Sequence, residues 1–345
     1  MILDIVSKSS KFAFYGAQVV AYGAYTAVKH LLNREPECFI VSKLDGNPGR
    51  IDGISVRTLD TVPTDTLIVI AVTELLQDEI AATLQAKGYP HTFQLSAHQE
   101  HLLMSQYYGS LGRFPLAMKT AGSIGDFALY EVRHHLDKPL RNHPKLEPWE
   151  VPVQAGAGLT DVRICEQLDS SGANMSIRNR QYCEASAMYW VWKNAKASWV
   201  GIEHYRRHLL VTPDMLNQDV DAILPLPYLC YPNSQAQFHR FVGEEVVQAL
   251  SDALKTIYPN EYDAYCKCLR GNYHYAYNLI AAKSSVFADY CEWAFRITDY
   301  METLGLQSIK ETRALAYTVE MLTSIYFVYN QDKLKIKHAE KAIYI

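Results

Sequence analysis

The sequence lacks the cysteine spacing that zinc sites and disulfide frameworks use. Its 7 cysteines form no C-x-x-C pair. The two that lie closest together, Cys266 and Cys268, have no second pair with which to complete a zinc site. An odd count with irregular spacing predicts reduced thiols and a cytoplasmic protein.

Long apolar runs and blocks of like charge are also missing. No apolar run approaches the length of a membrane span, and residues 1–10 are too short and too polar for a signal peptide. The 33 basic and 37 acidic residues give a net charge of -4, which argues against nucleic acid as a partner. Any work at the inner face of the cell membrane would therefore rest on peripheral association.

Apolar and aromatic residues are plentiful. A chain of 345 residues that is 49% hydrophobic can build two domains, each with its own core. Its 24 tyrosines suit half-buried strands and sugar sites alike, because the ring stacks on C–H groups while the hydroxyl forms hydrogen bonds. We predict a Rossmann-like domain over residues 1–100, a helical connector over 101–126 and a second α/β domain over 127–345.

Strand and helix patterns alternate through the first hundred residues, which predicts a parallel sheet with right-handed crossovers. Short apolar strand patterns and amphipathic helix patterns alternate in the order strand 11–16, helix 17–32, strand 38–42, strand 66–72, helix 74–87 and strand 92–95.

The dinucleotide fingerprint G-x-G-x-x-G is absent from the first strand–helix turn. Only Gly16 is present, Gln18 would block a pyrophosphate, and Ser42 stands where an acidic ribose ligand is expected. This argues against an NAD site and against an oxidoreductase or epimerase. The segment resembles the small Rossmann-like domains of sugar-acyltransferases and other polysaccharide-cluster proteins. That leaves two interpretations: a docking or homo-oligomerising domain, or a sensor of nucleotides or small metabolites.

The chemistry is expected in the second half, between residues 174 and 207. A helix over 180–194, with Asn179 as its N-cap, would place Glu184 among apolar residues, as a site carboxylate or in a structural ion pair. An apolar strand over 199–202 then runs into Glu203-His204-Tyr205-Arg206-Arg207-His208. Cations at the end of a strand suit a diphosphate, because the arginine fork binds phosphate oxygens in pairs. The alternative is a solvated basic surface.

A series of motifs continues through this half in a fixed order. They are Asn174-Met175-Ser176, Asn179, Tyr182-Cys183-Glu184, Tyr189 to Asn194, Val200 to Arg207, Ile223-Leu224-Pro225, Tyr258 to Tyr262, Tyr277 to Ile280 and Tyr290 to Phe295. Over residues 127–330 the series resembles a family assigned as glycosyltransferases of capsular, exopolysaccharide and lipopolysaccharide gene clusters, a former domain of unknown function. The resemblance implies a GT-A-like fold. The chain departs from it at Val319-Glu320-Met321, where the family carries an arginine.

The resemblance implies transfer of a sugar from a nucleotide-sugar donor to a glycan or lipid-linked glycan acceptor, a cell-surface polysaccharide or lipopolysaccharide precursor. GT-A enzymes usually hold a metal with Asp-x-Asp after the central strand, and at the corresponding place this sequence has His204, Arg206 and Arg207 instead. We therefore expect no metal and no cofactor, with Asp214 and Asp221 as the weaker alternative ligands. A non-catalytic phosphosugar- or nucleotide-binding module, docked in a biosynthetic complex, remains the other interpretation.

Site residues follow from these patterns. We predict catalytic roles for Glu184, His204 and Glu320, and acceptor binding by His239 and Asn278. The residues predicted to bind the donor are Gln154, Asn174, Asn179, Lys193, Asn194, His204, Tyr205, Arg206 and Arg207. The basic run at 333–338 predicts a final edge strand guarded by lysines, or a weak attachment to anionic lipid.

Overall fold

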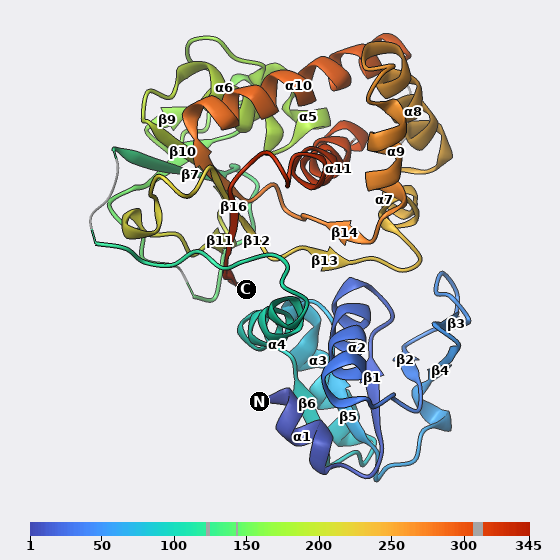
Figure 1. Cartoon of the computed structure of the whole chain (residues 1–345). Coiled ribbons are helices and arrows are strands. Elements are labelled where there is room, and N and C mark those ends of the chain that lie inside the picture. The colour runs from blue at the N-terminus through green and yellow to red at the C-terminus, as the bar shows by residue number, and fades with distance from the viewer. Residues whose placement is uncertain (122–124, 143, 306–312) are drawn as a thin grey trace. The chain divides into compact units, whose positions relative to one another are not determined.

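The computed structural model describes residues 1–121, 125–142, 144–305 and 313–345 (Figure 1). The chain forms two compact units. The first unit contains Met1–Phe114, Tyr228–Pro232 and Ile345, and the second contains Pro115–Pro227 and Asn233–Tyr344. Part of the predicted connector, residues 122–124, lies outside the described residues.

The first unit is built on a sheet of order β3-β4-β2-β1-β5-β6. Its elements are α1 (Ile2–Lys8), β1 (Phe12–Tyr15), α2 (Val19–Leu32), β2 (Phe39–Val41), β3 (Arg50–Ile51), β4 (Ile54–Thr58), β5 (Leu67–Ile70), α3 (Glu74–Ala86), β6 (Thr92–Gln94), α4 (Ala97–Ser110) and β13 (Tyr228–Leu229). Every neighbouring pair is parallel except β3 with β4. The four predicted strands and two predicted helices are therefore confirmed. The connector is helical only as far as Ser110.

The strand order reverses between β1 and β5, the position at which ligands of doubly wound sheets bind. Gly16 ends β1 there with a φ of 128°, and a Cβ at this position would lie 2.5 Å from the backbone oxygen of Ala71. The glycine is thus required by the close approach of two strands. The β3–β4 hairpin was not predicted, although its turn, Asp52-Gly53, has the positive φ pair of a type I′ turn.

The second unit is built on a larger mixed sheet whose main path is β16-β12-β15-β10-β7-β8-β9, with β11 and β17 joined at one side. Its strands are β7 (Phe127–Arg133), β8 (Glu150–Gln154), β9 (Gln167–Leu168), β10 (Trp199–His204), β11 (Arg207–Leu209), β12 (Ala222–Pro225), β14 (Tyr273–His274), β15 (Ile280–Lys283), β16 (Ile336–Ala339) and β17 (Lys341–Ile343). Strands β10, β7, β8 and β9 run parallel, and β15 is antiparallel to β10 and β12.

The second unit also contains helices, which lie beside its sheet (Figure 1). They are α5 (Asn179–Tyr182), α6 (Ala185–Asn194), α7 (Ser234–Val242), α8 (Glu244–Ile257), α9 (Tyr262–Arg270), α10 (Ser284–Thr303) and α11 (Ala314–Tyr329). Helix α10 packs on β10 and β15 and against α6, α8 and α11. The predicted α/β class is thus confirmed, as two mixed, mostly parallel sheets.

Two further predictions concern surfaces. The basic run ends in β16, the last strand on the main path of the second sheet. Its outer edge is not guarded by lysines alone, because the His338 backbone N–H donates to the Pro115 carbonyl at 3.0 Å and the His338 carbonyl accepts from Ala117 at 2.8 Å. Among the described residues, no helix combines the length and the hydropathy needed to cross a membrane.

Candidate active site

The backbone breaks immediately before Glu184. The continuous helix predicted over 180–194 is wrong, because α5 ends at a turn and α6 begins after it. Cys183 has φ 47° and ψ −126°, close to the first central position of a type II′ turn, which glycine dominates. Asn179 is the first residue of α5 rather than an N-cap. Because of this break, Glu184 lies between α5 and α6, where its side chain contacts the polar residue Asn278.

Buried hydrogen bonds hold this break in place. The Asn179 side chain donates to the carbonyl of Cys183 at 2.7 Å and to Ser186 Oγ at 2.9 Å. Ser186 in turn donates to Asp169 Oδ2 at 2.7 Å. An unfavourable φ persists only where surrounding contacts fix it, and these contacts do so here.

Asp169 was not among the predicted site residues, yet it is fully buried and organises the neighbouring turn. It accepts hydrogen bonds from the backbone nitrogens of Gly156 at 2.8 Å and Ala157 at 3.0 Å. The N–H groups of the Gly156 turn are thus bonded to this carboxylate, so the turn supports the break at Cys183.

Glu184 meets residues that lie far away in the sequence. Asn278 donates from Nδ2 to Glu184 Oε1 at 3.2 Å, and its own Oδ1 accepts from Thr323 at 3.1 Å. Asn278 is 1% exposed and precedes β15 instead of lying within a strand. Its amide therefore orients the Glu184 carboxyl. Acceptor binding by Asn278 stays a prediction.

Glu320, on α11, holds the loop that carries Asn278. Its Oε2 accepts from the backbone nitrogen of Tyr277 at 2.6 Å, and its Oε1 lies 3.2 Å from His274 Nε2. Tyr277 and Asn278 have φ values of 73° and 53°. Strained non-glycine residues of this kind cluster at functional sites. Because both of its oxygens are engaged, Glu320 has the contacts of a positioning residue.

Arg207 brings positive charge to the same cluster. Its guanidinium carbon lies 4.1 Å from the centroid of the Tyr277 ring. Burial raises the pKa of Glu184, the charge of Glu320 raises it further, and Asn278 and Arg207 oppose the rise. Glu184 nevertheless retains some solvent access. A carboxyl of raised pKa that solvent can still reach is suited to proton transfer.

The rest of the basic run diverges from this cluster. Burial and the charges of Arg207 and Arg206 lower the pKa of His204 to about 3, so this imidazole is neutral and does not add the expected third cation. Arg206 lies over the Tyr205 ring at 5.5 Å, and its charge only partly opposes the burial that raises the pKa of Asp137 to about 6. Tyr205 is buried against His204.

The amides predicted to bind the donor are bonded to the chain itself. Gln154 is fully buried and bonds Val162 and Ile164, which anchors the loop after β8. Asn174 donates to two carbonyls of its own turn, at 3.1 and 2.9 Å, and Asn194 bonds two others, each at 2.8 Å. Their role in donor binding stays a prediction.

The remaining predicted residues lie apart from Glu184. Lys193 is exposed, with Nζ 3.2 Å from the Trp192 ring centroid. His239 is exposed on α7 and pairs with Glu244 at 3.4 Å. Asp221, an alternative metal ligand, is bonded to Lys283 at 2.7 Å.

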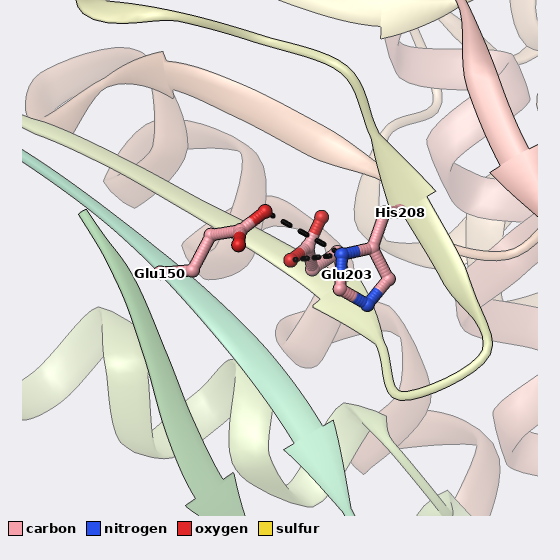
Figure 2. A group of neighbouring side chains, drawn as sticks. All are labelled: Glu150, Glu203 and His208. Carbon is pink, nitrogen blue, oxygen red and sulfur yellow. Dashed lines mark ion pairs between the residues drawn. The ribbon is translucent and has the colours of Figure 1, made fainter. Parts of the chain in front are cut away.

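A second cluster, unexpected from the sequence, is formed by residues of β7, β8, β10 and β11 (Figure 2). His208 Nδ1 lies 3.4 Å from Glu150 Oε1 and 3.4 Å from Glu203 Oε1, and Nε2 lies 3.6 Å from Glu131. Burial lowers the pKa of His208, but the three carboxylates outweigh it and raise that pKa to about 10. Burial raises the pKa of Glu203 to about 8. The sequence does contain a sign of this cluster: each of the apolar strands FALYEVR and WVGIEH includes one glutamate, Glu131 and Glu203.

Comparison with known proteins is consistent with this fold. The WbbM bifunctional glycosyltransferase, in its apo structure, superposes with a TM-score of 0.52 at 24% identity, over 63% of this chain and 45% of that one. The chain thus spans less than half of WbbM, and the match confirms the predicted glycosyltransferase-like fold. No curated protein matches the chain. The model of the domain of unknown function DUF4422 matches residues 132–331, more than half of the sequence, and the chain therefore belongs to the DUF4422 family.

Proposed function

We propose that the second unit is a glycosyltransferase that moves a sugar from a nucleotide-sugar donor to a glycan or lipid-linked glycan. The observation that carries the proposal is the convergence of Glu184, Arg207, Asn278 and Glu320 from four separate elements. The glycosyltransferase-like fold supports it, as does the resemblance to polysaccharide-cluster transferases.

Glu184 is assigned as the general base. It takes the proton of the acceptor hydroxyl while that oxygen bonds to the anomeric carbon, and the bond from this carbon to the diphosphate breaks. The raised pKa of Glu184 makes it a stronger base than an exposed carboxylate. Asn278 orients its carboxyl, and Glu320 holds the loop from which Asn278 projects.

The leaving nucleoside diphosphate needs positive charge, which we assign to Arg207, the arginine that lies at the Glu184 cluster. Electrostatic stabilisation of a departing group is often the largest single contribution to catalysis. The residues that follow Glu203 do not fit a metal bridging the diphosphate: His204, Arg206 and Arg207 supply no carboxylate, while Glu203 is paired with His208 and Asp221 with Lys283. We therefore propose that donor activation needs no divalent ion.

The first experiment combines binding and turnover with UDP-, GDP-, CMP- and dTDP-sugars. We expect thermal stabilisation by one nucleotide class, weakened in Arg207→Ala, and transfer that falls roughly 10²–10⁴-fold in Glu184→Gln. Glu292→Gln, an exposed carboxylate on α10, is the matched control. Equal turnover by the Glu184 variant and wild type would contradict the assigned base. Binding without turnover by any variant would favour the docked binding module.

Metal dependence is a separate measurement. Transfer should continue when excess EDTA is added at the start of the assay. Immediate and complete loss, restored by Mn²⁺, would contradict donor activation by arginine.

A further inference from the structure

The cluster of Glu131, Glu150, Glu203 and His208 brings three carboxylates around one imidazole, and some of its buried polar atoms have no hydrogen bond among the described residues. Glu131 and Glu203 face one another on β7 and β10, and Glu150 lies on the same face of β8. His208 lies over this face from β11, which β17 fixes from the other side. Figure 2 shows the carboxylates of Glu150 and Glu203 turned toward the same edge of the imidazole.

We propose that Glu150, Glu203 and His208 bind one Zn²⁺ ion. Their three ligand atoms lie within 4.8 Å of one another, and each carboxylate oxygen is 3.4 Å from Nδ1. Zinc bonds nitrogen and oxygen at about 2.0–2.2 Å, so tetrahedral ligands lie about 3.3–3.5 Å apart. The two distances to Nδ1 match two edges of such a tetrahedron, and the two carboxylate oxygens lie within 4.8 Å of each other, which leaves the fourth position to water.

A ligand atom without a hydrogen bond supports this independently of the spacing. Glu203 is 2% exposed, and its Oε1, the atom that faces His208, has no hydrogen-bond partner among the described residues. A buried carboxylate oxygen left unbonded is costly. A cation at the centre of the cluster would satisfy it.

The second ring nitrogen of His208 also lies near a carboxylate. Nε2 is 3.6 Å from Glu131, too far for a hydrogen bond, and has no hydrogen-bond partner among the described residues. Arg133 bonds Glu131 from Nε at 2.8 Å and from Nη2 at 2.6 Å. In metal sites a carboxylate that bonds the second ring nitrogen fixes the tautomer, and Glu131 is the carboxylate placed to do so if the ring shifts toward it when the ion binds.

This site is distinct from the proposed transfer chemistry. Its ligands are buried between strands, and the ion would connect β8, β10 and β11 rather than bridge a diphosphate. The proposal is therefore tested by metal binding without any activity assay, and its failure would leave the proposed function untouched.

The experiment uses the untagged, reduced full chain, stripped with chelator and titrated with ZnCl₂ against a chromogenic competitor. We expect one tightly bound equivalent. Glu150→Gln should lower the affinity by at least the roughly 10- to 100-fold typical of outer-shell partners. Glu147→Gln removes a neighbouring exposed carboxylate and should bind like wild type.

Cobalt substitution provides a second measurement that does not depend on a well-behaved variant. Co²⁺ in wild type should give the intense visible absorption of a four-coordinate oxygen and nitrogen site, without the thiolate charge-transfer bands that the 7 cysteines would produce. Equal zinc affinity in wild type and Glu150→Gln, or a thiolate spectrum, would overturn the proposal. Protons rather than a metal would then hold the cluster together.

Discussion

Replacement of Cys183 tests whether the turn before Glu184 is strained. Its φ of 47° and ψ of −126° suit glycine and disfavour any residue with a Cβ. Cys183→Gly removes the Cβ that causes the conflict. Cys183→Ala removes only the thiol and keeps the Cβ, so the pair of variants isolates the backbone contribution.

The expected difference in unfolding free energy follows from two opposing terms. Strain at such a backbone position is about 1–3 kcal/mol. Glycine costs about 0.5–1 kcal/mol through the greater freedom of the unfolded chain. The unfolding free energy of Cys183→Gly should therefore be about 1 kcal/mol higher than that of Cys183→Ala. For a domain of the size of the second unit, this difference raises the melting temperature by about 2–4 °C.

Calorimetry of both variants under identical conditions measures this difference directly. Transfer activity should be lower in Cys183→Gly than in Cys183→Ala, because a more flexible turn positions Glu184 less well. A glycine variant that melts below the alanine variant would refute the strain argument. Equal activity in the two would show that the turn does not position the carboxyl.

Further predictions concern stability around the site. The raised pKa of Glu184 means that its contribution to stability is complete below its ordinary value of 4.5 and is lost as pH rises through the folded pKa. Glu184→Gln should accordingly gain melting temperature relative to wild type as pH rises above the ordinary value of 4.5, and a pH-independent difference would contradict this. Gly201→Ala should cost roughly 1–3 kcal/mol in denaturant unfolding, since its Cβ would lie 2.5 Å from the Ile280 carbonyl oxygen; a neutral result would show that the strands yield. Asp169→Asn should cost about 1.5–3 kcal/mol by the same assay, through weaker hydrogen bonds to Gly156 and Ala157, and an unchanged midpoint would remove its structural role.

Much of the fold was predictable because periodic patterns record burial directly. The strands at 11–16, 66–72 and 199–202 are apolar runs of strand length, and each is a buried strand in the structure. Helix 17–32 follows from its apolar spacing in the same way. The residues within each of these elements are enough to predict it, because its apolar pattern does not depend on contacts with distant residues.

The candidate site was only partly predictable, because contacts between distant residues define it. Glu184, Asn278 and Glu320 were selected singly, and their convergence comes from the packing of α11 and the loop before β15. The break at Cys183 was missed because residues 179–194 have a helical pattern, while the buried side chain of Asp169 supports a different path. Tertiary hydrogen bonds overrode local propensity there.

The turn from β10 to β11 explains how one short run can serve both clusters. Strand alternation places Glu203 beside Glu131 on the face that the buried histidine covers, and sends the His204 side chain the other way. After the reversal at 205–206, Arg207 contacts Tyr277 near Glu184, while His208 returns to the carboxylates. Adjacent residues thus belong to separate sites. Arg207→Ala should therefore weaken transfer and leave zinc affinity intact, whereas Glu150→Gln should lower zinc affinity by at least roughly 10-fold and leave donor binding unchanged.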